Sequence, residues 1–120
     1  MTRKVRILVV DDEPDVVSTL TVLLEDEGYE VRGLQRGTEV MPEIAKFNPY
    51  AVLLDIAMPD MSGYEVAQQI RRRYGQMKPL LIAISGRYKK EPDRMLAELA
   101  GFDHHVAKPY DPNALLALLH

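Results

Sequence analysis

The chain has 120 residues, 47% of them hydrophobic and 28% charged, which predicts a single domain with one core. Its 15 basic and 18 acidic residues give a net charge of −3, which argues against a nucleic-acid-binding surface. No cysteine is present, so disulfides and thiolate metal ligands are excluded. The apolar runs are too short to cross a bilayer and no signal peptide is recognisable. We therefore expect a cytoplasmic protein with no membrane contact.

Five short apolar runs alternate with amphipathic stretches, the pattern of a doubly wound α/β domain with a parallel sheet. The first two strands are expected over about residues 4–10 and 30–34. The helix between them begins at Pro14, because proline suits the first helical position, and Gly28 ends it.

The second helix is expected over roughly residues 38–46, although Pro42 lies within it. A third strand covers residues 51–54, and a loop then leads to Gly63. These assignments complete the first half of an alternating sheet-and-helix pattern.

The third helix follows Gly63, and helical spacing predicts that it buries Ala67, Ile70 and Tyr74. The basic triplet at residues 71–73 is interpreted as a solvated face of this helix. A patch that binds phosphate is the less favoured interpretation of the same triplet.

The fourth strand is expected over residues 80–84, before a loop that ends at Pro92. Pro92 opens a fourth helix, whose thin apolar stripe is expected at Met95, Leu96 and Leu99. Gly101 is its expected C′ residue.

The fifth strand is expected over residues 104–107. The last helix is expected to begin at Pro112 with Asp111 as its N-cap, and its buried face is formed by leucines. These leucines are Leu115, Leu118 and Leu119.

Polar groups stand where four of these strands stop: Asp11, Asp12, Asp55, Ser85 and Lys108. Because parallel strands place their carboxyl ends at one edge of the sheet, where ligands bind, these groups are expected to gather there. Three neighbouring carboxylates cannot all stay ionised unless a cation neutralises them or one is protonated. Oxygen ligands alone suit Mg²⁺. One such aspartate would usually be a helix cap, but three beside a lysine favour a divalent-cation and phosphoryl site.

The same residues resemble the receiver domain of two-component response regulators, and the resemblance covers the whole chain. It rests on motifs in the family's order and spacing: Asp11-Asp12, Asp55 followed by Met58-Pro59-x-Met61-x-Gly63, Ser85-Gly86 and Lys108-Pro109. The resemblance implies a flavodoxin-like fold, with five helices and a five-stranded parallel sheet in the order 2-1-3-4-5.

The resemblance also implies roles for the site residues. Asp55 would accept the phosphoryl group, and Lys108 would contact that group. Asp12 would bind Mg²⁺ directly, Asp11 would bind it through water, and the backbone carbonyl of Ala57 would complete the protein ligands.

Two further positions would act as a switch in such a domain. Ser85 would be the switch hydroxyl, and as a catalytic residue beside Asp55 and Lys108 it would donate a hydrogen bond to a phosphoryl oxygen. His105 stands where the family often has Tyr or Phe but also uses His. The alternative for His105 is a half-buried strand histidine with no switching role. The bond between Lys108 and Pro109 is usually cis in this family. Ala57 and Arg87 stand at positions that tune how long the phosphoryl group lasts.

The implied function is phosphorelay signalling. The phosphoryl donor would be a histidine kinase or a histidine phosphotransfer protein, and the output face would be helix four, strand five and helix five. The domain would not be a conventional enzyme, since it catalyses only its own phosphorylation and dephosphorylation. No linker or DNA-binding module follows the last helix, so output is expected through a partner or a fused domain. The chain looks most like receivers of hybrid kinases or stand-alone regulators, and a monomer is expected.

Two other classes fit less well. A haloacid-dehalogenase-type phosphatase places its nucleophile on strand one with a second Asp two residues later, but Glu13 and Pro14 stand at those positions here. A flavodoxin-like cofactor module needs a Ser/Thr/Gly-rich loop after strand one, whereas Asp11, Asp12 and Glu13 would repel a flavin phosphate. A degenerate receiver used only for docking is disfavoured because no acceptor, metal or lysine position is lost.

Overall fold

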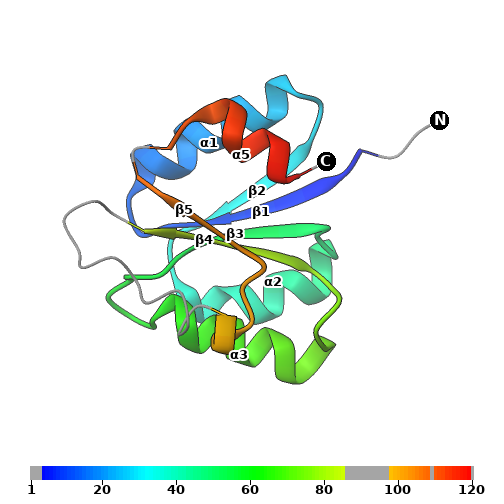
Figure 1. The fold of residues 1–120 in the computed structure, drawn as a ribbon, viewed down its shortest axis with the longest axis vertical. Coiled ribbons are helices and arrows are strands. Elements are labelled where there is room, and N and C mark those ends of the chain that lie inside the picture. The colour runs from blue at the N-terminus through cyan, green and yellow to red at the C-terminus, as the bar shows by residue number, and fades with distance from the viewer. Residues whose placement is uncertain (1–3, 86–97, 109, 120) are drawn as a thin grey trace.

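The computed structural model describes residues 4–85, 98–108 and 110–119. Five parallel strands form one sheet in the order β2-β1-β3-β4-β5, which confirms the expected topology. The strands are β1 (Arg6–Val10), β2 (Glu30–Leu34), β3 (Ala51–Asp55), β4 (Leu80–Ser85) and β5 (His104–Ala107). The helices are α1 (Pro14–Asp26), the 3₁₀ turn η1 (Gly37–Glu39), α2 (Val40–Phe47), α3 (Gly63–Tyr74) and α5 (Pro112–Leu118). Figure 1 shows α1 and α5 on one face of the sheet, and α2 and α3 on the other.

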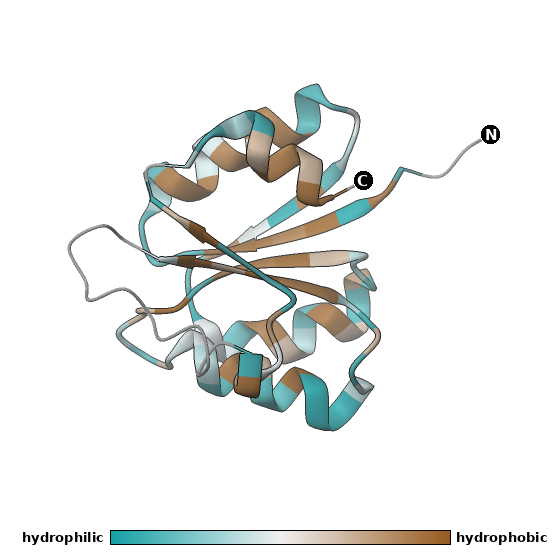
Figure 2. Ribbon diagram, in the orientation of Figure 1, coloured by the Kyte–Doolittle hydropathy of each residue, from teal (hydrophilic) through white to brown (hydrophobic). Residues whose placement is uncertain are grey.

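The core consists of two apolar layers, one on each face of the sheet. Along β1, Leu8 and Val10 pack towards α2 and α3, whereas Ile7 and Val9 pack towards α1 and α5. Because β1 and β3 are covered on both faces, their side chains form nearly continuous apolar runs instead of alternating with polar residues. Figure 2 shows these apolar central strands between helices that carry both apolar and hydrophilic residues.

The helix ends follow the expected local chemistry. Pro14 occupies the first position of α1, and Gly28 after the helix has a φ of 94°. Pro42 is tolerated because it lies in the first turn of α2, where backbone N–H groups need no intrahelical partner. Asp111 caps α5, its carboxylate accepting a 3.1 Å hydrogen bond from the backbone N–H of Asn113.

Four local expectations, which concern five residues, were wrong. Lys4 and Val5 lie outside β1, because pairing with β2 begins at Arg6. Tyr74 is exposed beside the guanidinium of Arg73, which lies 5.3 Å from its ring centroid. Leu99 is 75% exposed, because the neighbouring Ala100 is the residue that packs into the core.

The fourth wrong expectation concerns Arg71, which is only 7% exposed and does not belong to the solvated face. Burial of its guanidinium is compensated because it donates hydrogen bonds to the Asp103 carboxylate and to the backbone carbonyls of Gly101 and Pro79. Arg72 and Arg73 are exposed, as expected.

Parts of the sequence interpretation fall outside the described residues. They are the start of the fourth helix from Pro92, with Met95 and Leu96, the position of Arg87, and the peptide bond to Pro109. Residues 98–100 are helical, and Gly101 has the positive φ of 109° expected of a C′ glycine. Within the described ranges, no helix is long and apolar enough to span a membrane.

Candidate functional site

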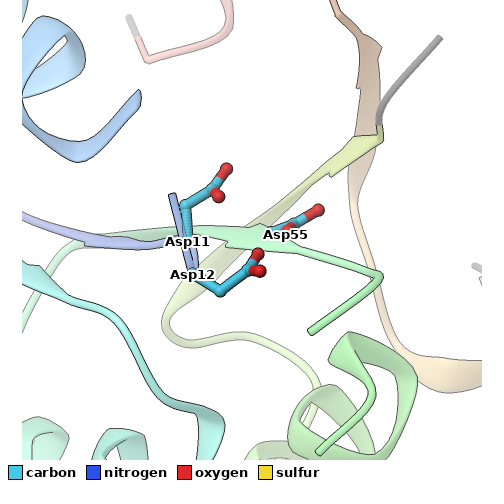
Figure 3. A group of neighbouring side chains, drawn as sticks. All are labelled: Asp11, Asp12 and Asp55. Atoms are coloured by element: carbon cyan, nitrogen blue, oxygen red, sulfur yellow. The ribbon is translucent and has the colours of Figure 1, made fainter. Parts of the chain in front are cut away.

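Three aspartates meet at the carboxyl edge of the sheet, as the strand pattern predicts. Asp11 and Asp12 follow β1, and Asp55 is the last residue of β3. One oxygen from each carboxylate lies within 4.8 Å of the other two, and Figure 3 shows the three side chains around a common space. Asp11 is fully buried and Asp55 is 3% exposed, so their charges are poorly solvated.

Lys108, the residue that follows the edge strand β5, brings a positive charge to this cluster. Its Nζ donates a 2.6 Å hydrogen bond to Asp11 Oδ2, and its backbone N–H donates to the carbonyl of Ser85. The second oxygen of Asp11 accepts a 2.9 Å bond from the backbone N–H of Glu13. Asp11 is thereby fixed between the lysine and the start of α1.

The charges in the cluster are not balanced. Burial raises the pKa of Asp55 to about 7, the Asp11 carboxylate adds to this rise, and Lys108 opposes it. Burial favours a lower pKa for Lys108, but its hydrogen bond to Asp11 and the attraction of Asp55 outweigh this and raise the pKa. One lysine therefore does not compensate the three carboxylates, and the site favours an additional cation.

The loop after Asp55 is held close to the Asp55 carboxylate. The backbone N–H of Ala57 donates to Asp55 Oδ1 at 3.4 Å, and the N–H of Gly63 donates to the carbonyl of Ile56 at 2.7 Å. A Cβ on Gly63 would lie 2.5 Å from the Asp55 carbonyl oxygen, so only glycine fits there. Ser62 then caps α3 by accepting a bond from the N–H of Tyr64.

Ser85 stands at the end of β4 beside this cluster, but its hydroxyl is engaged elsewhere. Ser85 Oγ and His105 Nε2 are 2.9 Å apart in a hydrogen bond, and Ser85 is 7% exposed. The structure therefore brings the two expected switch residues into direct contact. It also gathers Asp11, Asp12 and Asp55 with Lys108.

Sequence reasoning did not single out Asp60, which lies in the loop after Asp55. Its carboxylate accepts bonds from the backbone N–H groups of Gly37 and Thr38 at the start of η1. No local pattern connects these segments, which are more than 20 residues apart in the chain. Only the tertiary structure shows this contact.

The donor set fits a hard divalent cation. The three clustered side chains offer carboxylate oxygens only, and two of them are buried. Such oxygens suit Mg²⁺, whereas zinc sites usually contain cysteine or histidine. The cluster of Asp11, Asp12 and Asp55 could therefore hold a metal ion.

Comparisons with known proteins agree with this geometry. CreB, a transcriptional regulatory protein of Escherichia coli (strain K12), is 32% identical over 90% of this chain and 46% of its own length. An uncharacterised 14.6 kDa protein of Leptolyngbya boryana is 37% identical over 94% of this chain and 86% of that protein. The chain thus spans about half of CreB but most of the second relative. CreB is a transcriptional regulator, a type that the sequence interpretation favoured less than stand-alone or hybrid-kinase receivers.

Structural comparison leads to the same family. A CheY-like response regulator receiver domain from Methanospirillum hungatei superposes with a TM-score of 0.87 at 30% identity, covering 98% of this chain and 91% of that one. The phosphatase and cofactor-module alternatives gain no support from these similarities. The family model of the response regulator receiver domain matches residues 7–120. The chain therefore belongs to the response regulator receiver domains, the phosphorelay components of two-component signalling.

Proposed function

We propose that this receiver accepts a phosphoryl group on Asp55 in a reaction that requires Mg²⁺. The observation that carries the proposal is the convergence of three carboxylates within 4.8 Å, together with the 2.6 Å contact between Lys108 and Asp11. Receiver domains are phosphorylated by histidine kinases. The donor for this chain would be a histidine kinase or a histidine phosphotransfer protein.

Asp55 is the nucleophile in this proposal. A carboxylate oxygen of Asp55 forms a bond to the phosphorus, and the bond from phosphorus to the donor imidazole breaks. The product is an aspartyl phosphate, and the imidazole leaves with the electrons of the broken bond. The Asp55 pKa of about 7 leaves an ionised fraction available near neutral pH.

Lys108 stabilises the charge of the transferring group. Its ammonium is held beside Asp11 and remains protonated, because its pKa is raised above the ordinary value of 10.5. A fixed positive charge near the phosphoryl oxygens lowers the energy of the transition state without reorganisation of solvent. Lys108 is therefore a catalytic residue in this proposal.

The metal site would be formed by Asp12, Asp55 and the backbone carbonyl of Ala57, with Asp11 acting through water. Bound Mg²⁺ supplies positive charge to the phosphoryl oxygens. Asp11 also keeps Lys108 in place, since both of its oxygens accept hydrogen bonds. The domain would catalyse only its own phosphorylation and dephosphorylation.

The signal would pass through Ser85 and His105. A hydroxyl has one proton, so Ser85 cannot donate it to His105 Nε2 and to a phosphoryl oxygen at the same time. We propose that Ser85 is the donor in the 2.9 Å bond between them, which takes the tautomer of His105 with its proton on Nδ1, so this bond would rearrange when Asp55 is phosphorylated. The output face would combine the fourth helix with β5 and α5, contacting a downstream protein or a fused domain. We propose that the receiver itself is a monomer.

Phosphorylation of site variants tests the proposal. Wild-type protein incubated with radiolabelled acetyl phosphate should incorporate label only when Mg²⁺ is present, in an acylphosphate that hydroxylamine cleaves. Asp55→Asn preserves the side-chain volume and should abolish labelling, whereas Asp26→Asn at the exposed end of α1 should not. Equal labelling of Asp55→Asn and the wild type would refute the assignment. Turnover of a phosphomonoester would instead favour the phosphatase alternative.

A further inference from the structure

The middle of the loop at residues 56–62 is tied to a different part of the chain by Asp60. Asp60 Oδ1 accepts a 3.2 Å hydrogen bond from the Gly37 N–H, and Oδ2 accepts a 3.1 Å bond from the Thr38 N–H. Arg36, the N-cap residue of η1, makes no side-chain cap of its own. Asp60 therefore caps the turn that leads into α2 from a distant loop.

The charge of Asp60 suits this position. Burial alone would raise its pKa, but the bonds from Thr38 and Gly37 outweigh burial and lower it. The carboxylate is thus held ionised at the positive end of a helical segment, where a negative charge is stabilising. Both carboxylate oxygens of Asp60 accept hydrogen bonds, so the orientation of the loop at residues 56–62 is fixed as well as its position.

Close packing surrounds the same contact. A Cβ on Gly37 would lie 3.0 Å from Met61 Cβ, 3.0 Å from Val66 Cγ2 and 3.3 Å from Met58 Cε. The chain at Gly37 therefore lies directly against the loop and the first turns of α3. Hydrogen bonds and packing together join the start of η1 to the loop that follows Asp55.

The ends of this loop have separate anchors. Ile56 donates its backbone N–H to the carbonyl of Ile84 at 3.1 Å, and Gly63 donates to Ile56 at 2.7 Å. Between these anchors stands Ala57, whose carbonyl would be a metal ligand under the proposed function. Asp60 restrains the middle of the loop, three residues beyond Ala57 in the sequence.

We propose that Asp60 is a positioning residue for the cation site, because its bonds to Gly37 and Thr38 hold the loop that presents the Ala57 carbonyl. The inference rests on the proposed function, since it assumes that Mg²⁺ binds beside Asp55. Partners of metal ligands commonly change metal affinity about 10- to 100-fold. Asp60 acts through the backbone at a surface position, so we expect an effect of roughly three- to tenfold.

Simple charge attraction would give a different result from positioning. Any carboxylate near the site raises the local Mg²⁺ concentration, but that effect is strongly screened by salt. Glu39 is an exposed carboxylate in the same η1 turn, so Glu39→Gln removes an equal charge nearby and leaves the Asp60 bonds intact. The weaker Mg²⁺ binding caused by loss of a positioning contact should persist at high salt.

The test is a Mg²⁺ titration of ¹⁵N-labelled protein followed by backbone amide shifts, at about 0.05 M and about 0.5 M KCl. Asp60→Ala should raise the half-saturating Mg²⁺ concentration roughly three- to tenfold at both salt concentrations, with Asp60→Asn intermediate because it keeps one acceptor oxygen. Amide hydrogen exchange should accelerate at Thr38 and Ala57. Glu39→Gln should change half-saturation less than about twofold.

Three outcomes would overturn the inference. They are an unchanged half-saturation in Asp60→Ala, an equal effect in Glu39→Gln, or an effect that disappears at high salt. If Asp60→Ala does not fold, Asp60→Asn is judged by the same criteria. Failure of the wild type to bind Mg²⁺ or to be phosphorylated would instead refute the proposed function, so the two failures are distinguishable.

Discussion

Arg71 and Asp103 form an ion pair at the end of the sheet opposite the carboxylates, with 2.8 Å between Arg71 Nη2 and Asp103 Oδ2. The same guanidinium donates to the carbonyls of Gly101 and Pro79, each at 2.9 Å. Asp103 Oδ2 also accepts a 2.8 Å bond from the Leu81 N–H. One arginine on α3 thus joins the segments that lead into β4 and β5.

Arg71→Met should lower the free energy of unfolding by roughly 2–4 kcal/mol, because the Gly101 and Pro79 carbonyls lose the guanidinium donors and Asp103 keeps only the Leu81 N–H. Arg71→Lys should also destabilise, since an ammonium cannot reproduce the forked contacts of a guanidinium. Urea unfolding followed by circular dichroism measures both. Arg72→Met, at an exposed position, should remain within about 0.5 kcal/mol of the wild type. Equal stability of the Arg71 and Arg72 variants would contradict this role.

The sequence predicts the sheet and the carboxylate cluster because both follow from local patterns. Apolar runs indicate the strands, and the residue after each run lies at the edge of the sheet where Asp11 and Asp55 meet. Arg71 was misread because it belongs to a basic triplet and its partner Asp103 lies 32 residues further on. Its spacing of four residues from the buried Ala67 was the available signal.

The contacts that the sequence did not reveal are polar and long-range. Asp60 is one acidic residue in a loop until the fold brings it to Thr38. The bond between Ser85 and His105 likewise depends on the pairing of β4 with β5. Apolar periodicity determines which faces are buried, but it does not specify which donor meets which acceptor across the fold.

Gly63→Ala should perturb the position of Asp55 as well as the stability of the fold. The added Cβ would lie 2.5 Å from the Asp55 carbonyl oxygen and 2.7 Å from Ile56 Cα, and both neighbours are backbone atoms. We expect a loss of roughly 2–4 kcal/mol in stability and slower labelling of Asp55 by acetyl phosphate, because the backbone must shift.

Gly28→Ala provides the matched control for Gly63→Ala. Gly28 has a φ of 94° and no atom within 4 Å of an added Cβ, so alanine there strains the backbone without touching the site. It should cost about 1–2 kcal/mol and leave the labelling rate unchanged. If Gly63→Ala kept the stability and the labelling rate of the wild type, the close approach of residue 63 to the Asp55 backbone would not be required.

Asp55 should make the metal-free protein less stable as the pH rises. Burial and the nearby Asp11 raise its folded-state pKa from 3.8 to about 7, so the folded state retains a proton that the unfolded state has already lost. The contribution of the Asp55 carboxyl to the stability of the folded state is therefore fully present below about pH 4, falls as the pH rises towards 7, and is lost above that. In EDTA at pH 8, Asp55→Asn should be more stable than the wild type by roughly 1–3 kcal/mol.

The difference in the free energy of unfolding between Asp55→Asn and the wild type should shrink towards pH 4.5, where the Asp55 carboxyl of the wild type is protonated in the folded state. Urea unfolding at several pH values measures it, with Asp26→Asn as the exposed control on α1. A stability difference that stays constant with pH, or one that grows as the pH falls, would contradict the raised pKa.

Ser85→Ala should separate phosphorylation from its structural response. Asp55, the proposed nucleophile, and the Lys108 ammonium remain in this variant, so labelling by acetyl phosphate should change by less than about threefold. The hydroxyl that links the site to His105 is lost, so the amide shift changes along β5 on phosphorylation should fall by roughly half or more. Ser85→Thr keeps the hydroxyl and should restore the response. If β5 shifts fully in Ser85→Ala, the signal does not travel through the Ser85 hydroxyl.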